Sequence, residues 1–264
     1  MEPSRLSVPV LSLSRNLKQS FALARELGVS GVEIDGRRGI HAEEVSQTGL
    51  RQIRKWLDDE GLTVSAISFP TRRGYADVER IEARISATKS ALDMANSLGA
   101  RVVITHLGDI AVPQKDEPVD MRWSTLIEVL TDIGAYGLRV GATLCAEVGR
   151  ASPTEVLQLI EVLPEGSIQV DIVTGALLVF QHDPVHAIEQ LSTHVGFVHM
   201  TDAVAGAYAG RGNPAPLGTG DLDLLRVLGS LEECGYHGWL GLEHAHASDA
   251  MSEVIAAATL LRSL

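Results

Sequence analysis

Short apolar segments alternate with helix-like segments along the whole chain, and no other feature of the sequence limits the fold as strongly. The strand-like segments cover residues 8–13, 31–34, 63–68, 101–105, 140–146, 167–171, 195–200 and 239–243. Apolar residues at helical spacing lie between and after them, at residues 17–27, 47–60, 76–98, 122–136, 153–163, 182–191, 222–234 and 248–264. Near-continuous apolar strands are typical of parallel sheets buried on both faces, and eight strand–helix units in about 250 residues have the size of a TIM barrel. We therefore predict an α/β fold, a single (β/α)8 TIM barrel, with an open doubly wound sheet as the alternative.

No linker, low-complexity segment or change in composition divides the chain. We therefore expect residues 1–264 to form one domain. The longest irregular stretch covers residues 201–221, which follow the seventh strand-like segment. Irregular loops of this length in compact domains are usually functional, so we expect this loop to cover the mouth of the barrel.

The composition argues against several kinds of partner. The formal net charge is −12 and no long run of basic residues occurs, whereas binding to nucleic acid needs clustered Lys and Arg. No apolar run approaches the ~20 residues of a membrane helix, and the N-terminus lacks the apolar stretch of a signal peptide. The two cysteines, Cys145 and Cys234, lack metal-like or redox-like spacing and are expected to be free thiols. These features predict a soluble, cytoplasmic protein.

Four residues with metal-binding side chains stand at the downstream ends of strand-like segments. They are Glu147 in VGATLCAEVGR, Asp171 in SIQVDIVTG, His199 in VGFVHMTD and Glu243 in WLGLEHAH. In a closed parallel barrel such strand ends converge on one mouth. Three carboxylates and one imidazole form an oxygen-rich shell that suits a hard divalent cation. The alternative is that these acids are structural, paired with an Arg or a helix end or, for Asp171, acting as a helix cap.

Five motifs resemble those of the xylose isomerase-like TIM barrels, namely LCAEV, QVDIVTG, VHMTD, GTGDLD and GLEH. This superfamily holds sugar epimerases and isomerases, inosose dehydratases and the endonuclease IV group. The resemblance implies that the four strand-end residues bind Mn²⁺ or a similar ion, with Mg²⁺, Co²⁺ and Zn²⁺ as alternatives. It also implies that the two glutamates exchange a proton with the carbon next to a carbonyl, and that the protein is a homo-oligomer. The acidic net charge argues against the endonuclease branch, which needs a basic groove for DNA.

Four further residues are candidates for substrate binding. The resemblance implies this role for His106, at the end of the fourth strand-like segment, and for Arg211 in the 201–221 loop. Asp202 is expected to bond His199 or a water on the metal, and the alternative for His199 is a packed histidine bonded to Asp202. His246 reaches the mouth only if the last strand has ended before it, because strand alternation otherwise turns it away.

Two acids end the second strand-like segment. Glu33 and Asp35 lie in GVEIDGRR and share one face of the strand. Either they contact the substrate, or they form salt bridges with Arg37 or Arg38.

One position departs from the family pattern. The family's sugar epimerases usually carry His three residues after the sixth-strand Asp, where it helps to hold substrate, and this chain has Thr174 there. Either the substrate differs, or the contact comes from elsewhere, or the protein has lost turnover.

These observations favour a divalent-metal-dependent isomerase or epimerase that acts on a sugar or keto-polyol through an enediolate. One carboxylate removes a carbon-bound proton, and a second returns a proton on the opposite face. Two alternatives stay open: a metal-dependent lyase that dehydrates a keto-polyol, as inosose dehydratases do, and a sugar-binding barrel without catalysis. The predicted partner is a small sugar or polyol, not a nucleic acid or a membrane.

Overall fold

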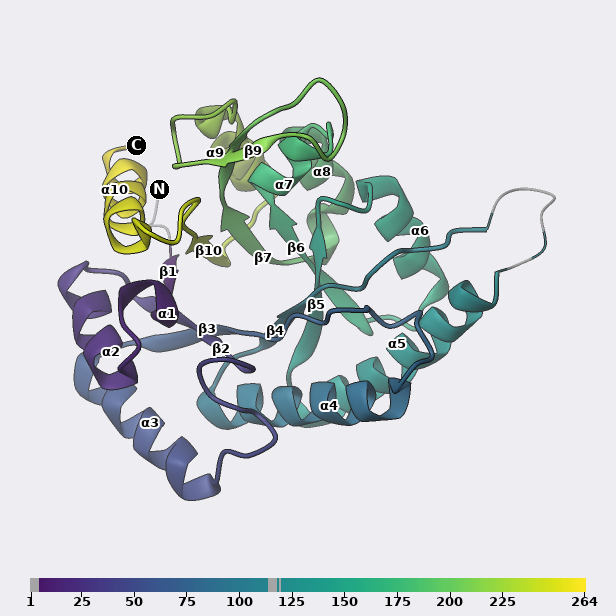
Figure 1. The fold of residues 1–264 in the computed structure, drawn as a ribbon, viewed down its shortest axis with the longest axis horizontal. Coiled ribbons are helices and arrows are strands. Elements are labelled where there is room, and N and C mark those ends of the chain that lie inside the picture. The colour runs from purple at the N-terminus through teal and green to yellow at the C-terminus, as the bar shows by residue number, and fades with distance from the viewer. Residues whose placement is uncertain (1–4, 114–117, 119) are drawn as a thin grey trace.

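Eight parallel strands close into a barrel in the computed structural model, which describes residues 5–113, 118 and 120–264 (Figure 1). Around the barrel the strands follow the order β1-β10-β7-β6-β5-β4-β3-β2. Their bounds are Arg5–Pro9 (β1), Gly31–Asp35 (β2), Thr63–Ser68 (β3), Val102–Thr105 (β4), Thr143–Val148 (β5), Ile168–Val173 (β6), Val195–Met200 (β7) and Trp239–Leu242 (β10). Each pair of neighbouring strands is parallel. The predicted (β/α)8 TIM barrel is therefore confirmed, and the open doubly wound sheet is excluded.

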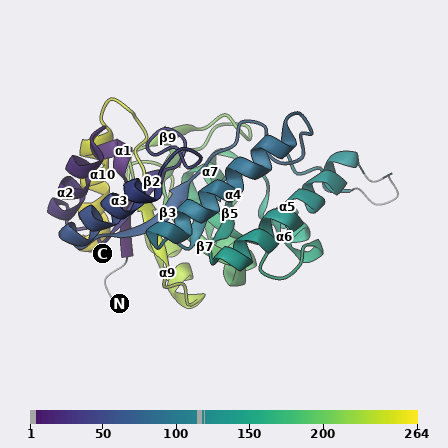
Figure 2. The same ribbon diagram turned by 90° about the horizontal axis from the view of Figure 1, so that it is seen from below.

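Helices form the outer layer around the strands. They are α1 (Val10–Leu13), α2 (Leu17–Glu26), α3 (Gln47–Glu60), α4 (Ile81–Leu98), α5 (Met121–Val140), α6 (Pro153–Val162), α7 (Thr174–Val179), α8 (Pro184–Leu191), α9 (Leu224–Glu233) and α10 (Ala250–Ser263), with a short 3₁₀ turn at Ser192–His194. In Figure 2, α3, α4 and α5 lie side by side along the near face of the molecule. Among the described residues, none of these helices has the length and apolar character needed to cross a lipid bilayer.

Local signals in the sequence explain where several helices begin and end. The Ser152 side chain accepts a hydrogen bond from the backbone N–H of Glu155, and the Glu155 carboxylate accepts one from the N–H of Ser152. This capping box starts α6 at the predicted place. Gly61 and Gly99 follow α3 and α4 in the left-handed conformation, with φ of 66° and 81°. Glycine adopts this conformation without a steric cost, so both predicted helix ends are confirmed.

Several predicted element boundaries are wrong, among them the start of the fifth strand, which is Thr143 because α5 continues to Val140. Two others are explained by single residues. The strand expected at residues 8–13 ends at Pro9, and Val10–Leu13 form the short helix α1. Proline has no N–H with which to continue the ladder of hydrogen bonds, so the strand ends there. The helix expected at residues 76–98 begins at Ile81, because Arg80 before it has a left-handed backbone with φ of 55°.

The 201–221 loop is not irregular throughout. It contains the short strands β8 (Asp202–Val204) and β9 (Asn213–Ala215), which pair antiparallel. Both strands contact α7, a helix that the sequence patterns did not predict. In Figure 1 this hairpin lies beyond the carboxyl ends of β6 and β7. The loop is therefore placed at the mouth side of the barrel.

The barrel interior holds an apolar cluster that is separate from the main core between strands and helices. Its members are Ala66, Val102, Ile104, Cys145 and Phe197, with Trp239 packed against them. Cys145 lies two residues before Glu147, and Phe197 lies two residues before His199. Strand alternation puts the residues of each pair on the same face. The interior therefore changes from apolar to charged toward the carboxyl ends of the strands.

Candidate functional site

The four predicted strand-end residues lie at the carboxyl ends of barrel strands. Glu147 in β5 is the register partner of Asp171 in β6. His199 lies in β7, and Glu243 directly follows β10. His199 Nδ1 lies 2.7 Å from Asp171 Oδ2, and His199 Nε2 lies 3.9 Å from Glu243 Oε1. Glu147 has another close partner, since its Oε2 lies 2.8 Å from the Nδ1 of His106.

Glu33 is a fourth acid at the mouth, and together with Asp171 and His199 it forms the buried floor of the mouth. Glu33 Oε2 lies 2.9 Å from His199 Nε2, so each ring nitrogen of the histidine faces a carboxylate. The three residues are 5%, 0% and 4% exposed. Glu33 comes from β2 and His199 from β7, with β1 and β10 between them in the barrel. Glu33 therefore reaches His199 across the barrel interior.

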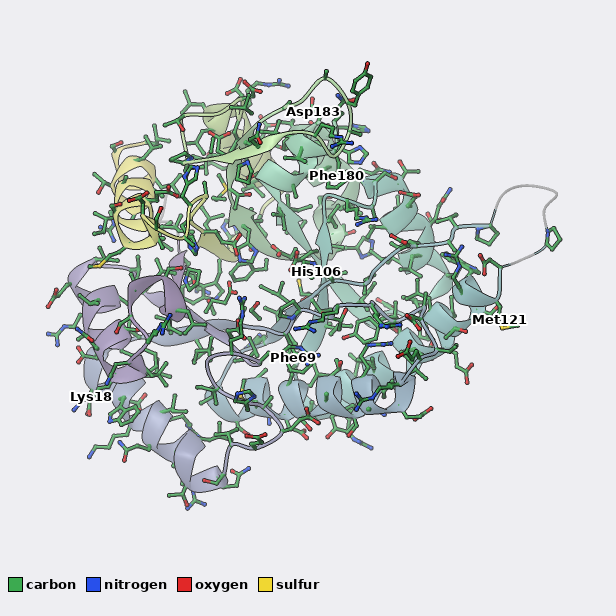
Figure 3. All side chains as sticks on the ribbon, viewed as in Figure 1. Lys18, Phe69, His106, Met121, Phe180 and Asp183 are labelled. Carbon is green, nitrogen blue, oxygen red and sulfur yellow. The ribbon has the colours of Figure 1, made fainter. Side chains whose placement is uncertain are left out.

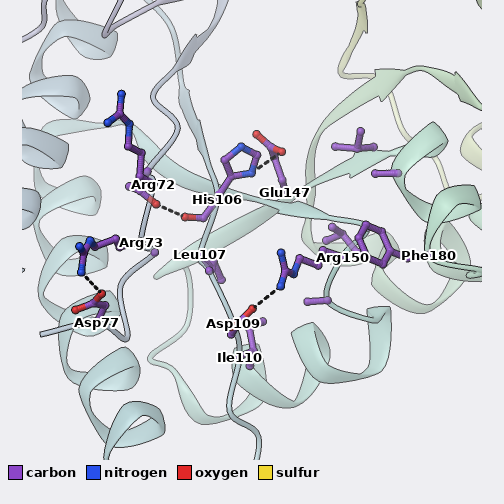
Figure 4. A pocket seen from close by; sticks show the side chains of 18 residues that line it. Arg72, Arg73, Asp77, His106, Leu107, Asp109, Ile110, Glu147, Arg150 and Phe180 are labelled. Carbon is purple, nitrogen blue, oxygen red and sulfur yellow. Dashed lines mark hydrogen bonds and ion pairs between the residues drawn. The ribbon is translucent and has the colours of Figure 1, made fainter. Parts of the chain in front are cut away.

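The rim pair, His106 and Glu147, is more open to solvent. Its side chains are 52% and 24% exposed. Figure 3 places His106 near the middle of the molecule, whereas Lys18 and Met121 lie at its periphery. Figure 4 shows the His106 ring directed toward the carboxylate of Glu147, with a dashed line between them. The hydrogen bond to Glu147 raises the pKa of His106 above its usual value.

Burial and charge shift the pKa values of the groups deeper in the mouth. Burial raises the pKa of Asp171, although the contact with His199 partly offsets this effect. Burial also raises the pKa of Glu243, and neighbouring carboxylates add to the rise. Burial alone would lower the pKa of His199, but the three surrounding carboxylates outweigh it and raise this pKa well above its usual value. One histidine thus lies among several acids, a concentration of negative charge that attracts a cation.

The donor chemistry of the mouth fits a divalent cation. Carboxylate oxygens with one imidazole nitrogen suit Mn²⁺, Mg²⁺ and similar ions. Asp171 Oδ1 is buried and has no hydrogen-bond partner among the described residues, which is costly unless a ligand satisfies it. The side chains do not already form a ready shell: in the described part of the chain, no three or more His, Cys, Asp and Glu are placed to hold a metal ion. His199 is bonded to acids on both sides, so a cation has to replace one of these contacts.

A cavity of about 560 Å³ opens beside the rim pair. Loops that follow β3, β4 and β5 line it, together with residues of α7 (Figure 4). Three arginines stand in this lining, namely Arg72, Arg73 and Arg150. Arg150 lies 3.2 Å from Asp109 and Arg73 lies 3.2 Å from Asp77. The cavity has the size of a small-molecule site and presents both charged and hydrogen-bonding groups.

A second cavity, of about 300 Å³, lies next to Glu243. Val173, Ala176 and Phe180 line both cavities and form a shared wall. Most of the remaining lining of the smaller cavity is apolar and includes Val179, Ala203, Pro214 and Ala215. Glu147 lines the larger of these two cavities and Glu243 the smaller, and the charges of the two glutamates interact.

Thr174, which stands where the family's epimerases carry His, is turned into the barrel wall. It is fully buried, and its Oγ1 lies 2.6 Å from the carbonyl oxygen of Thr201 and 3.2 Å from that of His199. The same oxygen accepts a hydrogen bond from the backbone N–H of Thr201. The hydroxyl therefore ties the start of α7 to the end of β7.

Asp202 organises the 201–221 loop, and the expected bond to His199 is not formed. Its carboxylate accepts hydrogen bonds from four backbone N–H groups, those of Ala203, Gly218, Gly220 and Leu222. The short strand β8 begins at this residue, and its side chain is directed into the loop instead of toward the floor. An acid that satisfies four amides of one loop holds that loop against the barrel.

His246 pairs with an acid of α10, and Arg211 lies in an exposed turn. The last strand ends at Leu242, as the prediction for His246 required, but His246 Nδ1 lies 2.7 Å from Glu253 Oε1 in α10. The His246 side chain is 56% exposed. Arg211 is exposed on the turn between β8 and β9.

The link between Glu33 and His199 was not predicted. The two acids of β2 were expected to contact the substrate or to pair with Arg37 or Arg38. Asp35 does pair with Arg38, whose Nε lies 2.9 Å from Asp35 Oδ2, whereas Glu33 is directed to His199. The available signal was the position of Glu33 at a strand end, the same signal that identified Glu147 and the other three residues.

The sequence matches one known family over most of its length. The profile described as "Xylose isomerase-like TIM barrel" matches residues 21–264. Among curated proteins, an uncharacterized protein of Methanocaldococcus jannaschii is 22% identical over 174 residues, which are 63% of this chain and 58% of that protein. The match thus spans less than two thirds of that relative.

Solved structures with the same fold cover nearly the whole chain. A xylose isomerase domain protein from Planctomyces limnophilus has a TM-score of 0.85 at 22% identity, covering 99% of this chain and 96% of that one. The 3-keto-D-glucoside 4-epimerase of E. coli has a TM-score of 0.80 at 15% identity, covering 99% and 100%. A xylose isomerase-like TIM barrel protein from Mycobacterium smegmatis, in complex with magnesium, has a TM-score of 0.76 at 18% identity, covering 98% and 97%. At these identities the likeness establishes the fold.

Proposed function

Because the chain belongs to the xylose isomerase-like TIM barrel family, we propose that it is a divalent-metal-dependent isomerase or epimerase of a small sugar or keto-polyol. One observation carries the proposal: a single histidine lies among acids at the mouth of the barrel, beside a buried oxygen of Asp171 that has no partner in the described residues. A sugar epimerase and a magnesium complex among the structural neighbours support it.

The cation would be held by the four strand-end residues, Glu147, Asp171, His199 and Glu243. Mn²⁺ is the first candidate, and the same donors accept Mg²⁺, Co²⁺ or Zn²⁺. When bound, such an ion supplies stabilisation of the negative charge that develops on the carbonyl and hydroxyl oxygens of the substrate. Asp171 Oδ1 has a free lone pair for this purpose, because no described group donates a hydrogen bond to it.

The two glutamates would move the protons. In an epimerisation one carboxylate removes the proton from the carbon next to the carbonyl, and the other returns a proton to the opposite face. The two carboxylates are close enough for their charges to interact, as two groups that serve one carbon must be. His106 donates a hydrogen bond to Glu147 and lines the larger cavity, so we assign it to substrate contact and to the orientation of that carboxylate.

Metal content is the first test of this proposal. We expect about one divalent ion per chain, measured by elemental analysis, in the wild type and in the matched control Glu253→Gln. Glu253 is an acid of α10 that pairs with His246 outside the floor. Asp171→Asn and Glu147→Gln should lose the ion or bind it more weakly. A wild-type protein that is metal-free and does not bind added Mn²⁺ would contradict the proposal.

Proton exchange is the second test, and it separates the isomerase from its alternatives. The metal-loaded protein is incubated in D₂O with a panel of ketoses and cyclic keto-polyols, and the products are followed by NMR. An isomerase or epimerase incorporates deuterium into a product with the formula of the substrate, and Glu147→Gln should slow this by about 10²–10⁴-fold. A product that has lost water identifies a lyase. Bound sugar without any exchange identifies a binding barrel without catalysis.

A further inference from the structure

Glu33 is a buried acid that the proposed chemistry does not use. It lies in β2 with only 5% of its surface exposed, and it is not among the residues that line the two cavities at the mouth. The basic residues that follow β2 do not neutralise it, since the Arg38 ion pair is made with Asp35. Its hydrogen bond goes to His199, where the distance from Glu33 Oε2 to the ring Nε2 is 2.9 Å. Burying a carboxylate costs free energy unless the group is hydrogen-bonded or paired, so the contact with His199 is what makes this position tolerable.

The position of Glu33 is set by the closed barrel. Glu33 and His199 are 166 positions apart in the sequence, and β1 and β10 separate their strands in the barrel. The two side chains meet inside the barrel, each about 5% exposed. The Phe197 ring packs against the imidazole with a centroid distance of 4.9 Å and a tilt of 52°. The ring of His199 is therefore held by a carboxylate at Nε2 and by an aromatic neighbour beside it.

We propose that Glu33 is the positioning residue for His199: its carboxylate accepts the Nε2–H hydrogen bond and so leaves Nδ1 as the nitrogen that binds the cation. This inference rests on the proposed function. A histidine that binds a metal offers a lone pair from one ring nitrogen and usually donates the N–H of the other to a carboxylate or carbonyl. Nδ1 is the nitrogen next to Asp171, whose Oδ1 has no hydrogen-bond partner among the described residues. The tautomer set by Glu33 therefore directs the lone pair toward Asp171, whereas the Oε1 of Glu243 lies 3.9 Å from Nε2.

Binding of Mn²⁺ to chelator-treated protein, measured by isothermal titration calorimetry, tests this role. Glu33→Ala removes the acceptor and should weaken binding by about 10–100-fold, the range for lost outer-sphere partners of metal-binding histidines. Glu33→Gln keeps an oxygen that accepts from Nε2–H, so it should retain most of the affinity. Asp35→Asn is the matched control: it lies on the same strand face and loses the same charge but does not contact His199, and it should bind as the wild type does.

A spectroscopic measurement reports the tautomer directly and does not depend on turnover. In protein with ¹⁵N-labelled histidine, loaded with diamagnetic Mg²⁺, the ring nitrogens of His199 are assigned by comparison with His199→Asn. The wild type and Glu33→Gln should show one tautomer with the proton on Nε2. Glu33→Ala should lose this fixed pattern, whereas a residue that merely supported the fold would leave it unchanged.

Each outcome of the calorimetry and the NMR experiment leads to one conclusion. If the wild type binds Mn²⁺ and both Glu33 variants bind it equally well with the same His199 tautomer, the positioning role is overturned and the proposed function stands. If the wild type binds no divalent ion, the proposed function fails and this inference fails with it. If Glu33→Ala does not fold, the Nε2–H tautomer and near-normal affinity of Glu33→Gln still support the role, and loss of either one overturns it.

Discussion

The floor and the rim of the barrel mouth each place a histidine beside a carboxylate, but the two histidines differ in burial and in the number of their acidic partners. On the floor, His199 lies between Asp171 and Glu33, and all three are almost completely buried. On the rim, His106 contacts the single carboxylate of Glu147, and half of its side chain faces solvent. The floor contacts therefore lack solvent screening, whereas the rim contact is weakened by water and salt.

This difference separates groups that hold the site from groups that meet the ligand. A charge on the floor can keep its ionised form only with its partners in place, so the floor is stable as a unit. The rim pair lines the larger cavity and is free to exchange its contact for one with a ligand. We expect substitutions on the floor to appear first as lost stability and substitutions on the rim to appear first as lost binding or turnover.

Replacing His199 should have the largest effect on stability. His199→Asn removes the positive charge between two buried carboxylates, and breaking such a pair costs about 3–5 kcal/mol in the free energy of unfolding. Urea denaturation of the chelator-treated wild type and variant measures this loss of unfolding free energy. A loss below about 1 kcal/mol, the range of an exposed ion pair, would show that floor and rim do not differ as we infer.

The pH dependence of stability should show the same floor contacts. The folded-state pKa of His199 lies well above the unfolded value of about 6.5, so the folded protein binds this proton more tightly than the unfolded chain. The stability that its charged form contributes is fully present below about pH 6.5 and is lost as the pH rises through the folded pKa. The folded-state pKa values of Asp171 and Glu243 are raised as well. The stability that these two groups contribute is therefore also lost as the pH rises, starting from about pH 4.

We therefore expect the unfolding free energy of chelator-treated protein to fall as the pH rises above about 6.5, by at most about 1.4 kcal/mol per pH unit for one group. Urea titrations at several pH values measure this slope. His199→Asn serves as the control and should have a smaller slope than the wild type. A slope of the same size in both proteins would assign the effect to other groups.

Replacing His106 should have the smallest effect on stability. The rim pair is exposed, and such pairs contribute about 0–1 kcal/mol. His106→Asn should therefore leave the urea midpoint close to that of the wild type, also at high salt. A loss comparable to that of His199→Asn would mean that the rim is as tightly coupled to the fold as the floor.

The barrel and the four strand-end residues could be predicted because their signals are local. Runs of apolar residues mark buried strands, and a polar residue at the end of such a run is visible without a structure. The errors at Pro9 and Arg80 arose where one residue overrides the pattern around it, through a missing N–H or a left-handed backbone. Periodicity describes the average of a segment and does not contain such single-residue effects.

Side-chain partners were harder to predict than strand ends. His246 was expected at the mouth and pairs with Glu253 instead, because the chain after β10 turns toward α10. Asp202 was expected to bond His199 or a water on the metal, and its carboxylate accepts hydrogen bonds from the amides of its own loop. In both cases the residue has a nearer partner than the site, and the direction of a short loop decides which partner it meets.

The sequence by itself determined that this chain forms a parallel barrel with acids and one histidine at the carboxyl ends of its strands, because strand periodicity and strand ends are properties of short segments. Only the tertiary structure decided which acids that histidine touches. Closure of the barrel places β1 and β10 between β2 and β7 and brings Glu33 against His199, although neither their spacing in the chain nor the pairing of neighbouring strands indicates that contact.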